Sequence, residues 1–477
     1  MKNLPISLGI IHFVGIGGIG MSGIAAVLHN VGCKVQGSDI SEGGNVHRLK
    51  DLGIRIFDKH DTANLQGVEL VVVSSAIKSD NPEVEGARQL LLPIIRRAEM
   101  LGGLMRLKLS VAVGGTHGKT TTTSMIASLM DSANMDPTVI NGGIINAWGS
   151  NARVGEGDWM VVEADESDGT FVDLPATIAV VTNIDQEHMD YYGSFDALRS
   201  AFNRFVENIP FYGFAVLCID DPEVQSLNSR ISDRKIVTYG KSSQADVQLT
   251  RLEPMERGSR FDVSILDRKS GIRRIIKDIF LPMHGSHNVQ NSLAVIAIAN
   301  EIGLSDELLL LSFKEFKGVK RRFTLTGKVD GIRFIDDYGH HPVEISAVLE
   351  ATRDSSSTGR IVAVLQPHRF SRLKNLFDGF CTCMNKADIV IVAEVYGAGE
   401  EPIDGFNKTT LIEGLKSHGH RHVLPLDSFS HLPSLLDNLV SNGDVVLFLG
   451  AGDITKVANS LPAELAAIRG CKVEGLS

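Results

Sequence analysis

The sequence predicts an α/β protein with three domains, and three observations lead to that prediction. At 477 residues the chain is too long for a single hydrophobic core. Its 47 glycines suit many tight turns between strands and helices. Short apolar runs of the buried-strand type lead into glycine-rich or polar segments at residues 15–20, 115–121 and 336–342. We therefore expect domains over residues 1–108, 109–325 and 326–477.

The first domain opens with a strand, Ile10–Val14, which is followed by the pattern Gly15-x-Gly17-x-x-Gly20 and a helix-like stretch. An acidic residue, Asp39, ends the next strand about 20 positions later. This is the dinucleotide-binding fingerprint of a Rossmann-like domain, in which a helix N-terminus binds a diphosphate. Three interpretations stay open: a nicotinamide dehydrogenase, a nucleotide-sugar site, or simply a tight strand-to-helix turn.

The central domain begins with the strand Leu109–Val113, the glycine-rich loop Gly115–Thr121 and a helix. Backbone N–H groups of such a loop cradle phosphate oxygens, and the helix N-terminus adds positive potential. Lys119 would reach the terminal phosphates, and the hydroxyl of Thr120 would bind Mg²⁺. The sequence therefore predicts a P-loop-type domain that binds a nucleoside triphosphate. Val113 stands where the usual pattern has a glycine, so the loop is a shortened form.

Two further buried-type strands of this domain, residues 159–163 and 178–182, end in polar side chains. Glu163 ends the first strand, and Asn183 and His188 follow the second. Because the carboxyl ends of parallel strands face the ligand crevice, we expect Glu163 to hold a metal ion that bridges phosphates. His188 is expected to bind metal or take part in catalysis. Three more carboxylates could equally form a solvated acidic loop: Asp165, Glu166 and Asp168.

From Val247 to Leu281 the apolar residues alternate with polar ones, which predicts a small antiparallel sheet. A helix follows, with Asn288 and Asn291 one turn apart. Their amides could read an adenine edge or cap the helix. The pair Arg321 and Arg322 could bind phosphate or form a solvated basic pair.

The third domain repeats the α/β rhythm and is predicted to be Rossmann-like. Its first strand, Arg333–Asp337, ends in the dense polar run Asp336–Pro342. A later strand, Ile361–Leu365, leads to His368-Arg369-Phe370-Ser371-Arg372, whose two arginines would share one helix face and could hold a carboxylate. Two further strands are expected over residues 388–392 and 444–449.

The overall charge excludes some classes of function. The net charge is −10 and the pI about 5.8, so a general nucleic-acid or anionic-membrane surface is not expected. No apolar run reaches the roughly 18 residues that would span a bilayer. The five cysteines are scattered, which suits a reducing cytoplasm and gives no zinc spacing. Anionic substrates would therefore have to be bound by local cationic sites.

Several motifs in one order along the chain resemble the Mur ligase family, the ATP-dependent amide-forming enzymes of bacterial peptidoglycan precursor synthesis. The resemblance is strongest to the members that add L-alanine to UDP-N-acetylmuramate, and the shortened loop with Val113 is typical of the family. The segments that carry it are His12–Ala25, Ser74–Ile77, Arg97–Leu101, Gly115–Thr121, Glu163–Asp168 and Asp336–Pro342.

The resemblance implies that the γ-phosphate of ATP passes to the lactyl carboxylate of UDP-N-acetylmuramate. The amine of L-alanine then attacks the acyl phosphate, with Mg²⁺ as cofactor. It implies a cytoplasmic enzyme that is a monomer or weak homodimer, without nucleic-acid or membrane partners. The same-family alternative is a ligase that recycles a whole peptide onto the same sugar. A nicotinamide dehydrogenase or a non-enzymatic ATP-switched module would leave part of the motif set unexplained.

The resemblance also assigns residues to each substrate. The implied UDP-sugar site comprises Gly15, Gly17, Gly18, Gly20, Met21, Ser22, Asp39, Ser74 and Ser75. The implied ATP site comprises Gly115, Thr116, His117, Gly118, Lys119, Thr120, Thr121, Asn288, Asn291, Arg321, Arg322 and Asp336. The implied amino-acid site comprises Tyr338, His341, Arg369 and Arg372. The implied catalytic residues are Lys119, Glu163, His188 and Asn183, and the implied metal ligands are Thr120, Glu163 and His188. No specific role is assigned to His117 or His340.

Overall fold

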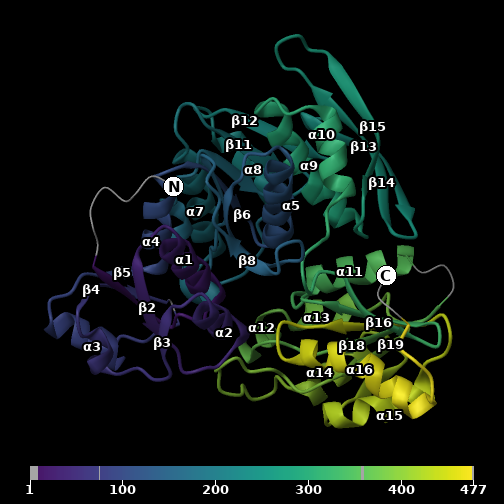
Figure 1. Ribbon diagram of the computed structural model, residues 1–477. Helices are drawn as coiled ribbons and strands as arrows, with labels where there is room; N and C mark the ends of the chain where they lie inside the picture. Colours follow the sequence, from purple (N-terminus) through teal and green to yellow (C-terminus); the bar gives the residue numbers. More distant parts are fainter. Residues whose placement is uncertain (1–8, 75, 356–358, 475–477) are drawn as a thin grey trace. The chain divides into compact units, whose positions relative to one another are not determined.

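The structure is a computed structural model that describes residues 9–74, 76–355 and 359–474, and it confirms the α/β class (Figure 1). The chain forms two compact units. The first contains the chain up to Arg251, Phe261–Phe280 and Gln290–Gly318. The second contains Leu252–Arg260, Leu281–Val289 and the chain from Val319 onward. The expected domain boundaries near 108 and 325 stay predictions.

The N-terminal sheet is parallel, with the strand order β3-β2-β1-β4-β5. The order reverses between β1 and β4, and in such sheets ligands bind at the carboxyl ends of the strands at that point. The Rossmann-like prediction is therefore confirmed for this part of the chain. The strands are β1 Ile10–Val14, β2 Lys34–Ser38, β3 Arg55–Phe57, β4 Val68–Val73 and β5 Ile94–Arg96. The helices are α1 Ile19–Asn30, α2 Gly44–Asp51, η1 Thr62–Leu65, α3 Pro82–Gln89 and α4 Arg97–Met105.

The central sheet has the order β15-β14-β13-β12-β11-β10-β6-β9-β7-β8. Its strands are β6 Leu109–Gly114, β7 Thr138–Ile145, β8 Ser150–Arg153, β9 Trp159–Glu163, β10 Ile178–Val181, β11 Phe214–Cys218, β12 Ile236–Gly240, β13 Val247–Met255, β14 Gly258–Leu266 and β15 Arg273–Leu281. Its helices are α5 Lys119–Ser132, η2 Thr170–Asp173, α6 Met189–Tyr192, α7 Phe195–Glu207, α8 Pro222–Arg230, α9 Ser286–Glu301 and α10 Asp306–Lys314. The strands expected between Val247 and Leu281 are present, and they extend one edge of this sheet.

Three neighbouring strands of the central sheet position the phosphate loop. Strand β6 pairs in parallel with β10 on one side and with β9 on the other. Helices α5 and α7 lie on either side of β6 in Figure 1. On the α7 side, Phe202 and Phe205 are fully buried and pack against the sheet and Phe171. The loops that follow β6, β9 and β10 therefore leave one edge of the sheet side by side.

The C-terminal sheet has the order β16-β17-β21-β18-β19-β20 and is parallel except for the edge strand β16. Side chains alternate between its two faces: Ala363 packs in one core and Val364 in the other. Helices cover both faces, as the Rossmann-like prediction requires. The strands are β16 Thr324–Val329, β17 Ile332–Asp337, β18 Ile361–Leu365, β19 Ile389–Val392, β20 Val423–Pro425 and β21 Val445–Leu449. The helices are α11 Pro342–Ser355, α12 Phe370–Asn375, α13 Phe377–Cys383, α14 Lys408–Ser417, η3 Phe429–His431, α15 Leu432–Leu439 and α16 Ile454–Arg469.

Helix length and hydropathy bear on the membrane expectation. Among the residues that the structure describes, none of the helices combines the length and the apolar character needed to cross a bilayer.

Candidate active site

The glycine-rich loop between β6 and α5 needs its glycines for space and for backbone conformation. Gly115 and Gly118 have φ angles of +128° and +81°, which residues other than glycine rarely adopt. A Cβ atom on Gly115 would lie 2.0 Å from the hydroxyl oxygen of Thr182. A Cβ atom on Gly118 would lie 2.6 Å from the amide oxygen of Asn291. The loop therefore lies tight against the end of β10 and against α9.

The residues after β10 hold the loop by hydrogen bonds to its backbone. The amide oxygen of Asn183 accepts from the N–H of His117 at 2.7 Å, and its amide nitrogen donates to the carbonyl of His117 at 3.1 Å. The hydroxyl of Thr182 donates to that same carbonyl at 2.6 Å. Asn183, which is expected to be catalytic, is placed as a support of the phosphate loop. The ring of His117 lies 3.5 Å from the carboxylate of Asp185.

Lys119 lies at the first position of α5, and its ammonium group points back into the loop. Its Nζ atom donates to the carbonyls of Gly115 and Thr116 at 2.6 and 3.0 Å, and to Oε1 of Glu166 at 2.8 Å. Burial by itself would lower the pKa of Lys119, but the carboxylates of Glu166 and Glu163 outweigh it and raise that pKa. The lysine is therefore fully charged and largely buried in the place where phosphates are expected.

Carboxylates and one histidine surround the loop from the ends of β9 and β10. Glu163 accepts from the N–H of Gly142 at 2.7 Å. The ring of His188 lies 3.8 Å from the carboxylate of Glu166 and 3.9 Å from that of Glu187. The ligand atoms of Glu166, Glu187 and His188 all lie within 4.8 Å of one another, so this set could hold a metal ion. Oxygen donors of this kind suit Mg²⁺.

Glu166 is the carboxylate for which the sequence leaves a site role and a solvated loop equally open. Its pairing with Lys119 is a tertiary contact, and the sequence around it is simply acidic. Burial raises the pKa of Glu166 to about 7. A carboxylate that is only 2% exposed does not belong to a solvated loop, so the solvated interpretation fails for this residue.

The remaining ATP-site candidates of the central sheet are buried side chains. Thr120 and Thr121 lie in the first turn of α5 and are 7% and 4% exposed. Asn288 and Asn291 are three residues apart on α9, as expected, and both are buried. The amide of Asn288 donates to the carbonyl of His284 at 2.7 Å, which supports the start of the helix.

In the second unit, an aromatic ring brings two arginines together. The guanidinium groups of Arg321 and Arg322 lie 4.8 and 5.3 Å from the centre of the Tyr338 ring. Arg321 also donates to the carbonyl of Gly450 at 2.5 Å and lies 3.7 Å from the carboxylate of Asp336. Burial raises the pKa of Asp336 above its ordinary value. These ATP-site candidates of the second unit therefore form one cluster.

The two arginines expected to bind an amino acid differ in their surroundings. Arg369 immediately precedes α12 with a φ of +68°; its side chain is 46% exposed and lies 3.8 Å from Glu400. Arg372, inside the helix, lies 3.2 Å from Nδ1 of His368. Burial, helped by a neighbouring histidine and these arginines, lowers the pKa of His368 to about 3, so its ring is neutral. His341 is 3% exposed at the start of α11.

Asp39, the acidic residue of the glycine-rich fingerprint after β1, binds groups of the protein itself. One carboxylate oxygen of Asp39 accepts from the N–H of Gly17 at 2.8 Å, and the other accepts from the backbone and hydroxyl of Ser41. A dehydrogenase would offer this carboxylate to a ribose. A Cβ atom on Gly20 would lie 2.7 Å from the guanidinium of Arg97, so this turn borders a cation.

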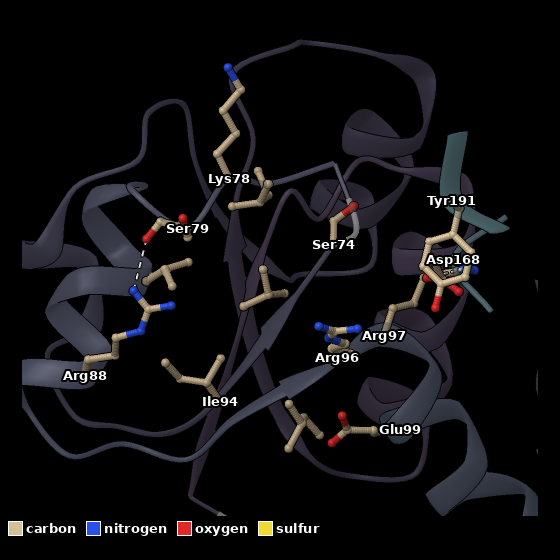
Figure 2. A pocket seen from close by; sticks show the side chains of 14 residues that line it. Ser74, Lys78, Ser79, Arg88, Ile94, Arg96, Arg97, Glu99, Asp168 and Tyr191 are labelled. Carbon is tan, nitrogen blue, oxygen red and sulfur yellow. Dashed lines mark hydrogen bonds and ion pairs between the residues drawn. The ribbon is translucent and has the colours of Figure 1, made fainter. Parts of the chain in front are cut away.

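A pocket of about 470 Å³ opens at the carboxyl ends of β4 and β5 (Figure 2). Figure 2 shows Ser74 near Arg96 and Arg97, with Arg97 pointing toward Asp168. Arg97 donates to Asp165 at 2.9 Å and lies 3.8 Å from Asp168. The polar or charged lining residues are Ser74, Lys78, Ser79, Arg88, Arg96, Arg97, Glu99, Asp168 and Tyr191.

Of the nine predicted UDP-sugar residues, Ser74 lines this pocket. The lining does not include Gly15, Gly17, Gly18, Gly20, Met21, Ser22 or Asp39. Met21 and Ser22 lie in α1 with side chains 1% and 0% exposed, and Ser22 bonds to the carbonyl of Ile19. Ser75 lies outside the described residues. The cationic residues Arg88, Arg96 and Arg97 were not in the predicted set, although Arg97 belongs to a motif of the resemblance.

Three family models together match nearly the whole chain. The Mur ligase family catalytic domain matches residues 10–109, the Mur ligase middle domain residues 113–299, and the Mur ligase glutamate ligase domain residues 321–452. The chain belongs to the Mur ligase family. The middle-domain model covers the phosphate loop and the carboxylates after β9, and the glutamate ligase domain model covers the arginine cluster of the second unit.

Curated and solved relatives agree with this membership. The chain is 61% identical over 470 residues to the UDP-N-acetylmuramate–L-alanine ligase of Rhodospirillum centenum. The matched region covers 98% of this chain and 97% of the relative. The crystal structure of the UDP-N-acetylmuramate–alanine ligase of Thermotoga maritima is similar with a TM-score of 0.81 and 32% identity, over 96% of this chain and all of that one. A murein peptide ligase from Psychrobacter arcticus shares the fold, with a TM-score of 0.70 and 24% identity over 96% and 98%.

Proposed function

We propose that this Mur ligase joins L-alanine to the lactyl carboxylate of UDP-N-acetylmuramate at the expense of ATP. The observation that carries the proposal is the phosphate loop with its buried Lys119, in a chain that is 61% identical over 98% of its length to a relative of that name. The expected products are the amide, ADP and phosphate. The peptide-adding alternative rests on a relative that is 24% identical, a likeness that extends only to the fold.

In the first unit, the phosphate loop would bind ATP. Lys119 would neutralise charge on the γ-phosphoryl group as it transfers, and the backbone N–H groups of the loop would hold the other phosphates. Thr120 and Glu163 would hold one Mg²⁺ and His188 a second, and the two cations would supply the positive charge that lets a carboxylate and a triphosphate approach each other. Asn183 would keep the loop in place through its two bonds to His117.

The pocket at β4 and β5 would hold the nucleotide part of UDP-N-acetylmuramate. Arg97 supplies positive charge beside the glycine-rich turn, and Arg96 lines the same pocket. Helix α1, which follows that turn, would present its N-terminus to the diphosphate. Local cations of this kind offset the net charge of −10, which would otherwise repel an anionic substrate.

The second unit would bind the amino acid. Arg372 donates to the neutral ring of His368 and would bind the carboxylate of the amino acid. Tyr338, His341 and Arg369 would complete the site. L-Alanine offers only a methyl group for recognition, so selection against larger side chains would be worth about 1–3 kcal/mol per excess methylene.

Phosphate release tests the proposal directly. With Mg-ATP and UDP-N-acetylmuramate, release should depend on L-alanine, and a tripeptide offered in its place should not support turnover. Lys119→Ala should abolish release, whereas Lys314→Ala, which replaces an exposed lysine of α10, should leave it unchanged. Phosphate release that is independent of both UDP-N-acetylmuramate and L-alanine would refute the ligase, and turnover with the tripeptide alone would favour the peptide-adding enzyme.

A further inference from the structure

The ammonium group of Lys119 already has a full set of partners in the protein. A lysine carries three N–H donors. Its Nζ atom lies within 3.0 Å of three acceptors: the carbonyls of Gly115 and Thr116 and Oε1 of Glu166. Two of these acceptors are neutral parts of its own loop, and Glu166 is the anionic one. A phosphate oxygen therefore has to take the place of an acceptor that is already bound.

Glu166 is held firmly in this position. Its side chain is 3% exposed, and that of Lys119 is 14% exposed. The backbone carbonyl of Glu166 accepts from the hydroxyl of Tyr192 at 2.6 Å and from the N–H of Gly169 at 3.1 Å. Within the described part of the chain, its second carboxylate oxygen, Oε2, is buried and accepts no hydrogen bond. Glu166 therefore keeps a buried oxygen that no hydrogen bond from the described protein satisfies.

We propose that Glu166 is a positioning residue that holds Lys119 in the empty phosphate loop and competes with the phosphates of ATP for its ammonium group. The inference rests on the proposed function for ATP as the ligand of the loop. The contact stabilises the empty loop, because a buried ammonium without a counter-ion is strongly destabilising. It also opposes binding of the nucleotide, because the carboxylate and the phosphates repel each other at close range.

Binding of ATP in the presence of EDTA, at a pH well above 7, isolates this competition from the metal and keeps Glu166, whose pKa is about 7, ionised. Glu166→Gln keeps the shape of the side chain and removes its charge. We expect calorimetry to show that ATP binds roughly tenfold more tightly to this variant than to the unmodified protein. Glu166→Asp keeps the charge and should stay within about threefold of the unmodified protein. An equal increase of the affinity for ATP in both variants, or a lower affinity of Glu166→Gln for ATP, would overturn the proposal.

The neighbouring carboxylate provides a matched control. Asp165 is in the same loop but pairs with Arg97 at 2.9 Å, so Asp165→Asn makes the same change of net charge without touching Lys119. We expect it to change the affinity for ATP by less than about threefold. An effect equal to that of Glu166→Gln would mean that the general charge of the loop matters, and not the contact with Lys119.

Chemical labelling of Lys119 reports the contact without any nucleotide. In the unmodified protein Lys119 should be acylated by an amine-reactive reagent much more slowly than the exposed Lys314, and Glu166→Gln should speed its labelling about tenfold. Unchanged labelling in Glu166→Gln would refute the holding role. Because neither measurement uses UDP-N-acetylmuramate or L-alanine, a failure of the ligase proposal is seen separately, in phosphate release.

Discussion

A buried carboxylate in the N-terminal domain should control the acid stability of that domain. Glu83, at the start of α3, is fully buried and accepts from Ser38 at 2.5 Å and Asn64 at 2.7 Å. The rings of His12 and His60 lie 3.2 and 3.1 Å from it. Burial by itself would raise the pKa of Glu83, but His12, Ser38 and Asn64 outweigh burial and lower that pKa from 4.5 to about 2.

The magnitude follows from that shift. A lowered pKa means that the ionised group stabilises the fold above pH 4.5 and that this contribution disappears as the pH falls toward 2. A shift of about 2.5 units corresponds to about 3 kcal/mol. Glu83→Gln should therefore destabilise the N-terminal sheet by about 3 kcal/mol at pH 7. The reason is that the NH₂ group of the glutamine would face hydrogen-bond donors where a carboxylate oxygen accepts from them. At pH 3 the difference from the unmodified protein should shrink.

Hydrogen exchange is the suitable assay, because both tryptophans, Trp148 and Trp159, lie outside this domain and fluorescence would not report on it. Exchange of peptides from β1 and β2 at several urea concentrations gives the free energy of opening, and comparison of both proteins at one pH removes the intrinsic rate. Glu85→Gln, on the exposed face of the same helix, is the control. A change below about 1 kcal/mol at pH 7 would refute the reasoning.

Two further predictions concern the proposed substrate sites. Arg97→Ala should raise the KM for UDP-N-acetylmuramate by roughly 10- to 100-fold with little change in the KM for ATP, which steady-state kinetics would measure; an unchanged KM would place the diphosphate elsewhere. Arg372→Ala should raise the KM for L-alanine by about 30-fold and Arg369→Ala by less, because Arg372 is fixed by His368 and Arg369 is half-exposed. The reverse order of these two effects would contradict the assignment of the amino-acid site.

The architecture of the ATP-binding edge could be predicted because its signals are local. The runs Trp159–Val162 and Ile178–Val181 are continuously apolar, as strands buried on both faces must be, and both strands are where the sequence predicts them. The glycines at 115 and 118 permit the positive φ angles that the structure has there. The position of the site follows from the strand order, because adjacent parallel strands place the loops that follow them at the same edge of the sheet.

Pairing between side chains could not be predicted in the same way. Whether Glu166 is solvated or buried depends on the approach of Lys119 from the start of α5, and nothing in the acidic sequence around Glu166 distinguishes it from Asp165. Asp39 follows the spacing of a ribose ligand, yet its two oxygens bind Gly17 and Ser41. These outcomes depend on a few ångströms of tertiary packing, which residue type and spacing do not specify.

The acidic loop after β9 explains how an acidic chain keeps cations ready for anionic substrates. Two adjacent residues, Asp165 and Glu166, bind Arg97 of the pocket and Lys119 of the phosphate loop. An unpaired arginine or lysine in these buried places would be costly, so each cation needs a counter-ion while no substrate is bound. A phosphate that binds then replaces a carboxylate as the partner of the cation. Only the difference between the two interactions contributes to the affinity for the substrate. The same carboxylates that stabilise the empty sites thus limit how tightly those sites bind phosphate.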